Sequence, residues 1–218
     1  MTRVALVHAL AHSVAPVNAA FERDWPQCVR MNLLDDSLSA DLARGGRGLD
    51  DGMTARFLAL AAYAVGTGAQ GILFTCSAFG PCIDAVARAH PGLPVLKPNE
   101  AMIAEAVARG RRIGLVATFA PTLASMPAEF PAGVDVVPVL AEGALDALNR
   151  GDVARHDGLV AEAARRAAQA GCDVVALAQF SMARAAAAAA TAAGMPVLTT
   201  PDSAVRALAA RLGVRIAG

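Results

Sequence analysis

Short runs of apolar, often β-branched residues recur along the chain and alternate with longer stretches of helical character. Runs of this kind, bounded by Gly, Pro or polar residues, are typical of buried strands. The pattern predicts strands at Val4–His8, Val29–Leu33, Ile72–Thr75, Val95–Lys97, Ile113–Ala117, Val134–Val139, Val174–Ala178 and Pro196–Leu198.

The stretches between these strands are rich in Ala, Leu, Glu and Arg, which favour helices. They predict helices near Val14–Arg23, Met53–Val65, Gly80–Ala89, Asn99–Arg109, Val153–Ala170, Met182–Ala192 and Ser203–Leu212. Alternation of helices with uniformly apolar strands predicts an α/β fold in which parallel sheets are flanked by helices.

The apolar composition does not predict a membrane protein. Mean hydropathy is +0.46, but much of it comes from alanine, and Arg, Asp or Gly interrupts each apolar run before the roughly 18 residues that a membrane span needs. The 19 basic and 19 acidic residues balance, so we expect no nucleic-acid partner. Because Met1-Thr2-Arg3 leads directly into the first strand, without the pattern of a signal peptide, we expect a cytoplasmic protein.

The four cysteines lack the spacing of a metal site or a disulfide framework. Cys28, Cys76, Cys82 and Cys172 form no CxxC pair and no Cys/His cluster, so we expect no bound metal. Disulfides are not expected in a reducing cytoplasm. Cys28, Cys82 and Cys172 fit best as structural thiols.

Two halves of the sequence resemble each other. Gly68–Cys76 matches Gly171–Gln179 with an offset of 103 residues, and Arg3–His8 matches Arg112–Ala117 with an offset of 109. Each half also contains a Pro-Val-Leu strand. We therefore predict a duplicated lobe, with residues 1–97 plus 203–218 in the first lobe and residues 98–202 in the second.

Parallel sheets bind ligands at the carboxyl ends of their strands. Two duplicated lobes that face each other would place such ends on both sides of one cleft, where we expect the active site. His8, Cys76, Thr118 and Gln179 all lie at or just beyond a predicted strand end.

Cys76 is the strongest candidate for a catalytic residue. It stands in Thr75-Cys76-Ser77, between a buried strand and a helix, where the partial positive charge of the helix N-terminus favours a thiolate. The hydroxyls of Thr75 and Ser77 can donate hydrogen bonds to an anionic ligand. The alternative is a buried thiol that packs as a small apolar side chain.

Hydroxyl groups follow the central strand of each half. Thr118 and Thr122 flank Pro121, which suits the first turn of a helix, and they could bind a carboxylate or simply cap that helix. Ser13 falls opposite Thr122 in the repeat. His8 could act as an acid or base, or be a structural histidine.

Gln179 and Ser181 occupy the second half's counterpart of Thr75-Cys76-Ser77. They suit either a polar binding role or a strand end with a helix cap. Arg44–Gly48 is glycine-rich but lacks a nucleotide-binding motif, so it is either a surface connection or a lid. His90 and His156 are expected at the surface.

The order of these motifs resembles the aspartate/glutamate/hydantoin racemase superfamily across essentially the whole chain. The resemblance rests on Ile72–Ser77, Ile113–Thr118 with Pro121-Thr122, Asp173–Gln179 and the two Pro-Val-Leu strands. It implies a two-lobed α/β enzyme without a cofactor, in which one cysteine per lobe moves a proton at the carbon next to a carboxylate. Maleate isomerases and arylmalonate decarboxylases are relatives. Cys76 matches the first cysteine position, whereas Gln179 stands at the second.

Three functions follow as hypotheses. The first is a racemase-like isomerase that acts on a small carboxylate-bearing substrate, with Cys76 as acid or base and His8, Ser13, Thr75, Ser77, Thr118, Thr122, Gln179 and Ser181 as substrate-binding residues. The second is a one-thiol decarboxylase of malonate-type acids, or a cis–trans isomerase of an unsaturated diacid. The third is a non-catalytic binder of small carboxylates. A homodimer or higher homo-oligomer is possible under each.

Overall fold

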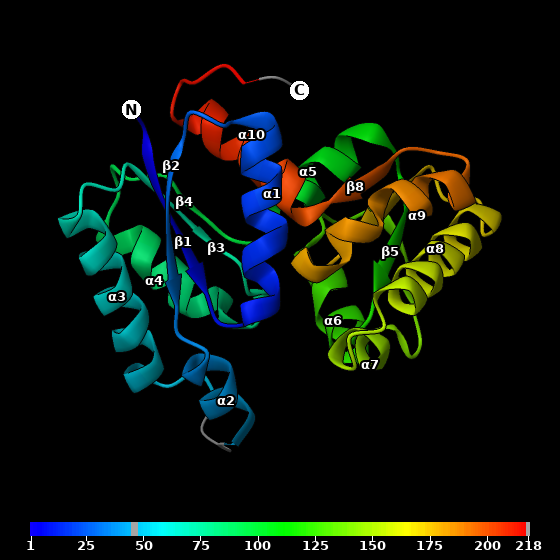
Figure 1. Cartoon of the computed structure of the whole chain (residues 1–218), viewed down its shortest axis with the longest axis horizontal. Coiled ribbons are helices and arrows are strands. Elements are labelled where there is room, and N and C mark those ends of the chain that lie inside the picture. The colour runs from blue at the N-terminus through cyan, green and yellow to red at the C-terminus, as the bar shows by residue number, and fades with distance from the viewer. Residues whose placement is uncertain (45–47, 217–218) are drawn as a thin grey trace. The chain divides into compact units, whose positions relative to one another are not determined.

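The computed structural model describes residues 1–44 and 48–216. It divides into two compact units, Met1–Pro98 with Ala204–Gly218, and Asn99–Ser203. Each unit contains a four-stranded parallel sheet flanked by helices (Figure 1), so the predicted α/β architecture with two lobes is confirmed. The centre of the glycine-rich segment, residues 45–47, lies outside the described residues.

The first unit has strand order β2-β1-β3-β4. Helices α3 and α4 cover one face of its sheet, and α1 lies on the other (Figure 1). The strands are β1 (Arg3–His8), β2 (Val29–Leu34), β3 (Gly71–Phe74) and β4 (Val95–Leu96). The helices are α1 (Val14–Asp24), α2 (Ser37–Arg44), α3 (Asp51–Gly66) and α4 (Gly80–Ala89).

The second unit repeats this order as β6-β5-β7-β8. Alternate residues of β5 enter two cores: Val116 packs with α8 and α9, while Ile113 and Leu115 pack with α5. The strands are β5 (Arg112–Ala117), β6 (Asp135–Leu140), β7 (Val174–Leu177) and β8 (Val197–Thr199). The helices are α5 (Glu100–Arg109), α6 (Ala120–Ser125), α7 (Ala144–Asn149), α8 (Val153–Gln169), α9 (Ala186–Ala193) and α10 (Thr200–Arg211), of which α10 continues into the first unit.

Strand register follows the internal repeat. Val4 of β1 pairs with Gly71 of β3, and Ile113 of β5 pairs with Val174 of β7. The offsets are 109 (113−4) and 103 (174−71), which are the offsets of the sequence match. The two sheets therefore pair their central strands identically, and residues related by these offsets occupy equivalent backbone positions.

The helix that precedes the third strand ends in the same way in both units. Gly68 after α3 and Gly171 after α8 have φ of +84° and +77°, a region that glycine enters without steric cost. Ala69 N–H then bonds Ala64 O at 3.1 Å, and Cys172 N–H bonds Ala167 O at 3.3 Å. These bonds satisfy the last free carbonyls of each helix and return the chain to the sheet.

Every predicted strand is present, and no strand end differs from its predicted position by more than one residue. The prediction did not include helices α2 and α7, and it anticipated α6 only through the helix start at Pro121. The helix predicted from Met182 begins as the 3-10 helix η4 (Phe180–Ala185) and becomes α-helical only at Ala186. Within the described residues, no helix has both the length and the apolar character to cross a membrane.

Candidate active site

Cys76 lies at the carboxyl end of the first unit's sheet. It is the second residue after β3, in an extended conformation (φ −129°, ψ 119°), and the chain then enters the 3-10 helix η2 (Ser77–Phe79) and α4. All four cysteines lie in the described part of the chain, and Cys28, Cys82 and Cys172 are buried whereas Cys76 is half-buried. Cys76 is therefore the accessible thiol of the four.

The thiol of Cys76 is less acidic than its place in the sequence predicts. Burial raises the pKa of Cys76 above its ordinary value, and the backbone N–H of Ala78 and the hydroxyl of Ser39 offset only part of that rise. Burial thus opposes the thiolate that the helix N-terminus favours, because loss of hydration outweighs these local hydrogen bonds. In the resting protein Cys76 is therefore a protonated thiol near neutral pH.

An apolar crevice adjoins the thiol. Its remaining walls are Val7, His8, Ala9, Leu38, Phe57 and Phe74, and it is too tight to hold a water molecule. Leu38 and Ser39 belong to α2, so this helix supplies both an apolar wall and a hydrogen bond to the Cys76 region.

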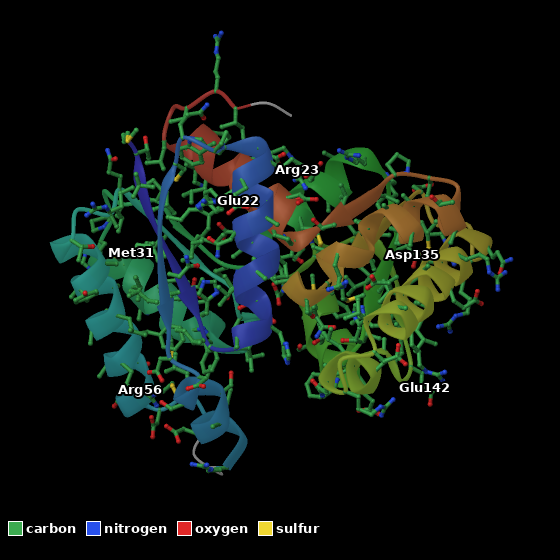
Figure 2. The ribbon with its side chains drawn as sticks, in the orientation of Figure 1. Glu22, Arg23, Met31, Arg56, Asp135 and Glu142 are labelled. Atoms are coloured by element: carbon green, nitrogen blue, oxygen red, sulfur yellow. The ribbon has the colours of Figure 1, made fainter. Side chains whose placement is uncertain are left out.

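Arg56 of α3 (labelled in Figure 2) forms hydrogen bonds that stabilise the position of α2. Its guanidinium donates to Asp41 of α2 and to Asp35 just before it, each at 2.8 Å, and also to the Ser37 hydroxyl. Leu38 is fully buried in the adjacent core. Ser39 therefore has a defined position beside the thiol, although α2 is short.

Behind Cys76 lies a buried network centred on His8. His8 Nδ1 is 3.0 Å from Thr75 Oγ1 and 3.1 Å from Ser13 Oγ, and its Nε2 is 3.0 Å from Asn32 Oδ1. Asn32 Oδ1 also accepts from Asn18 Nδ2 at 2.9 Å, so the amide oxygen faces His8 and the imidazole carries its proton on Nε2.

This tautomer makes His8 an acceptor for the residue before Cys76. The Ser13 hydroxyl donates to Leu10 O at 2.7 Å, which leaves the Thr75 hydroxyl to donate to Nδ1. His8 is fully buried, and burial lowers its pKa despite the hydrogen bond from Nε2 to Asn32. In this arrangement neutral His8 accepts a hydrogen bond from Thr75 and fixes the end of β3.

The second unit has Gln179 at the position equivalent to Cys76. Gln179 Oε1 accepts from the Thr118 backbone N–H at 2.7 Å and from the Thr118 hydroxyl at 2.9 Å. Thr118 is buried and Gln179 half-buried. The two predicted binding residues thus bind each other and tie β5 to the end of β7.

The remaining predicted hydroxyls are more accessible. Ser77 is exposed, and Thr122 and Ser181 are half-buried. Pro121 lies in the first turn of α6, as predicted, but the residue at the N-cap is Phe119. Thr118 therefore does not cap this helix.

The surface position predicted for His156 is wrong, because the first turn of α8 packs inward and buries it completely. Its Nδ1 lies 2.7 Å from Asp157 Oδ1. Among residues 1–44 and 48–216, no three His, Cys, Asp or Glu side chains gather as metal ligands would.

A family model described as Asp/Glu/Hydantoin racemase matches residues 12–208. The chain belongs to this family. The match spans both units, Cys76 and Gln179 included, and confirms the resemblance that the motifs indicate. At the level of the family, the chain is a racemase-like enzyme of the isomerase type.

Solved structures with the same fold include an allantoin racemase from Klebsiella pneumoniae (17% identity, 98% of this chain and 89% of that chain, TM-score 0.69). An aspartate racemase from Picrophilus torridus is also similar (12% identity, 100% and 96%, TM-score 0.70), as is unliganded arylmalonate decarboxylase (15% identity, 98% and 93%, TM-score 0.64). At these identities the likeness concerns the fold alone. A sequence comparison with curated proteins gave no match.

The sequence-based prediction missed Ser39, Leu38 and Asn32 as neighbours of the site. Asn32 lies on the predicted strand β2, but nothing in its sequence context points to His8. Ser39 and Leu38 lie on α2, which the sequence pattern did not predict. Only the packing of Leu38 and the contacts of Arg56 reveal their place.

Proposed function

We propose that this chain is a cofactor-independent enzyme that moves a proton at the carbon next to a carboxylate, with Cys76 as the acid/base. The supporting observation is the placement of Cys76, the accessible thiol at the carboxyl end of β3 in a chain of the racemase family. The substrate is a small amino acid or related acid.

The two hydroxyls that flank Cys76 in the sequence have different roles. Ser77, exposed beside the thiol, is suited to donate a hydrogen bond to a carboxylate or enolate oxygen. The hydroxyl of Thr75 is hydrogen-bonded to His8, so Thr75 positions the end of the strand and its hydroxyl already has a partner.

The protonation state of the Cys76 thiol favours a step in which Cys76 donates a proton. A thiol with a raised pKa begins the cycle protonated, so it can pass its proton to a carbanion-like carbon without prior activation. Abstraction from carbon requires that Cys76 first lose its proton, and racemisation requires a second group for the opposite face. Gln179 stands where the repeat offers that group, and an amide does not titrate in this range.

A second candidate, decarboxylation of a malonate-type acid, is favoured by this observation. The bond between the α-carbon and one carboxylate breaks, carbon dioxide leaves, and the electron pair stays on the α-carbon as an enolate. The Cys76 S–H then gives its proton to that carbon, and the thiolate regains a proton from solvent. One thiol suffices for each turnover.

The test is α-proton exchange in heavy water over a panel of amino acids, hydantoins and malonates, with carbon dioxide release measured in parallel. We expect turnover of at least one substrate class by native protein and loss of about 10²-fold or more in Cys76→Ala. Equal background rates in both proteins on every substrate contradict the proposal. Ligand-induced stabilisation that survives Cys76→Ala without turnover would instead indicate a carboxylate-binding protein.

Gln179→Cys separates the two candidates. It restores a titrating group at the second repeat position, so we expect it to increase exchange of both enantiomers of a racemisable substrate. Carbon dioxide release that depends on Cys76 and does not respond to Gln179→Cys identifies the decarboxylase.

A further inference from the structure

Arg56 of α3 contacts three groups of the segment that forms α2. Its Nη2 donates to Asp35 Oδ2 at 2.8 Å and to the Ser37 hydroxyl, and its Nη1 donates to Asp41 Oδ2 at 2.8 Å. The side chains of Arg56 and Asp35 are 32% and 29% exposed, so this ion pair is partly shielded from water. Because Asp35 precedes α2 and Asp41 lies in its second turn, one guanidinium holds both the start and the middle of the helix.

Asp35 also connects α2 to the sheet. Its backbone N–H donates to His8 O at 3.0 Å, at the end of β1. Its Oδ1 accepts from the Ser37 N–H at 3.2 Å, in the first turn of α2. The carboxylate that binds Arg56 is therefore the point at which α2 leaves the edge of the sheet beside the site.

Helix α2 shields the Cys76 thiol. Its residue Leu38 is fully buried and lines the apolar crevice beside Cys76, and the hydroxyl of the next residue, Ser39, is hydrogen-bonded to Cys76. Burial is the largest cause of the raised pKa of Cys76, and α2 supplies one wall of that burial. A helix of eight residues is not stable by itself in water, so the shielding depends on the contacts that hold α2.

We propose that Arg56 is a positioning residue for Cys76, which acts by holding α2 against the thiol so that Leu38 keeps water away from it. A thiol that is shielded from water keeps its proton, and a hydrated thiol loses it more readily. Arg56 thus keeps Cys76 ready to donate a proton to carbon. This inference rests on the proposed role of Cys76 as the acid/base.

The sign of the effect distinguishes this role from a simple effect of charge. Besides Arg56 and the two carboxylates that it binds, the elements around Cys76 carry the titratable residues His8, His12, Asp36, Asp51 and Asp84, the last of which pairs with Lys97 at 2.7 Å. A nearby cation favours a thiolate, so the loss of charge alone in Arg56→Gln would raise the pKa of Cys76 and slow its alkylation. Release of α2 hydrates the thiol and has the opposite effect.

The test measures alkylation of Cys76 by iodoacetamide as a function of pH, with the labelled sites located by peptide mass spectrometry. We expect Arg56→Gln to raise the rate at pH 7.5 about fivefold, because the two ion pairs that hold α2 are lost, and to lower the pH at which the rate is half-maximal. Arg56→Lys keeps the charge without the forked contact and should lie between Arg56→Gln and native protein. Ser39→Ala removes a donor while α2 stays in place, so it should slow alkylation.

Two carboxylates provide a matched comparison. Asp41→Asn removes one partner of Arg56 and should accelerate alkylation, and the double variant with Arg56→Gln should be no faster than Arg56→Gln alone. Asp36→Asn removes the same charge one residue before α2, from an exposed side chain that is not among the groups that Arg56 contacts. It should leave the rate nearly unchanged.

Cys82 reports unfolding of the whole unit, because it is fully buried in the core against which Cys76 packs. Faster alkylation of Cys76 and Cys82 alike in Arg56→Gln overturns the inference, as does an unchanged or slower rate at Cys76. Equal effects of Asp36→Asn and Asp41→Asn also overturn it, since charge would then explain both.

The proposed function and this inference can fail separately. Alkylation that depends on Arg56 in a protein that turns over no acid supports the positioning role and counts against the proposed function. Turnover that is lost in Cys76→Ala, together with alkylation that Arg56→Gln does not change, supports the proposed function and overturns the inference.

Discussion

Replacing Gln179 by Leu removes the acceptor that holds the end of β5 to β7. Gln179 Oε1 receives two hydrogen bonds from Thr118, whose backbone N–H is at 2.7 Å and whose hydroxyl is at 2.9 Å. An unsatisfied buried donor costs about 1–3 kcal/mol. Thr118 is only 7% exposed, but its hydroxyl can rotate and Gln179 is half-buried, so water recovers part of the loss. We expect Gln179→Leu to destabilise the second unit by about 1–2 kcal/mol.

The hydrogen-exchange rate of the Thr118 backbone N–H measures the loss of its hydrogen bond to Gln179 Oε1. A loss of about 1–2 kcal/mol corresponds to roughly 5- to 30-fold faster exchange if the amide exchanges by local opening. Gln179→Glu keeps an oxygen acceptor for both donors, so at pH 7 it should preserve protection. Thr118→Val removes the hydroxyl and keeps the N–H bond, and should lie between the two.

Protection of the Thr118 amide that is equal in Gln179→Leu and native protein would refute this account. The same holds if Gln179→Glu loses as much protection as Gln179→Leu, because the effect would then follow side-chain substitution in general. Either result would mean that water or another group already satisfies Thr118.

Three further outcomes follow from the same structure. Because burial raises the pKa of Cys76, its alkylation by iodoacetamide should keep accelerating through pH 9, and a plateau below pH 8 in mass-spectrometric rates would contradict this. The pKa of His8 is lowered from 6.5, so its contribution to folding is complete above about pH 6.5 and is lost as the pH falls towards the lower folded value. Below pH 6.5, the free energy of unfolding of His8→Asn should therefore change less with pH than that of the native protein, by up to about 1.4 kcal/mol per pH unit. The same pH dependence in both proteins, measured by urea denaturation at several pH values, would count against this. A Cβ on Gly114 would lie 2.6 Å from Ala167 Cβ, whereas one on Gly71 would meet the flexible end of Leu208 at 3.0 Å. Gly114→Ala should therefore lower the free energy of unfolding by about 1–3 kcal/mol, and Gly71→Ala by less. A larger loss of thermal stability in Gly71→Ala than in Gly114→Ala would refute this.

The fold was predictable because its inner strands, β1, β3, β5 and β7, are short, apolar and buried on both faces. Strand β3 and its counterpart β7 are completely buried, so nearly every residue signals its environment. Helix α2 gave no such signal. Its sequence, Ser37–Arg44, spans only about two turns, in which Leu38 enters the core and Leu42 packs against it while only partly buried. Tertiary contacts, Arg56 above all, stabilise this helix, and they depend on residues distant in sequence.

The place of Cys76 was predictable, but its chemistry was not. A strand end before a helix can be read from sequence because the hydrophobic run stops there. The pKa of the thiol depends on a balance between burial and nearby donors, and one of those donors is Ser39 of α2. His156 shows the same limit, because its polar neighbours suggested exposure while the packing of α8 buries it.

The matching registers give the difference between Cys76 and Gln179 a definite meaning. Since Val4 pairs with Gly71 as Ile113 pairs with Val174, the two residues occupy the same backbone position and differ only in side chain. A thiol can give up a proton there, whereas the amide of Gln179 uses its oxygen to bind Thr118. The duplicated fold has therefore kept its symmetry in the backbone and lost it in its titrating groups. That asymmetry is why we expect proton transfer from Cys76 to reach one face of the substrate carbon, and why Gln179→Cys is the variant that tests whether the second position can take part.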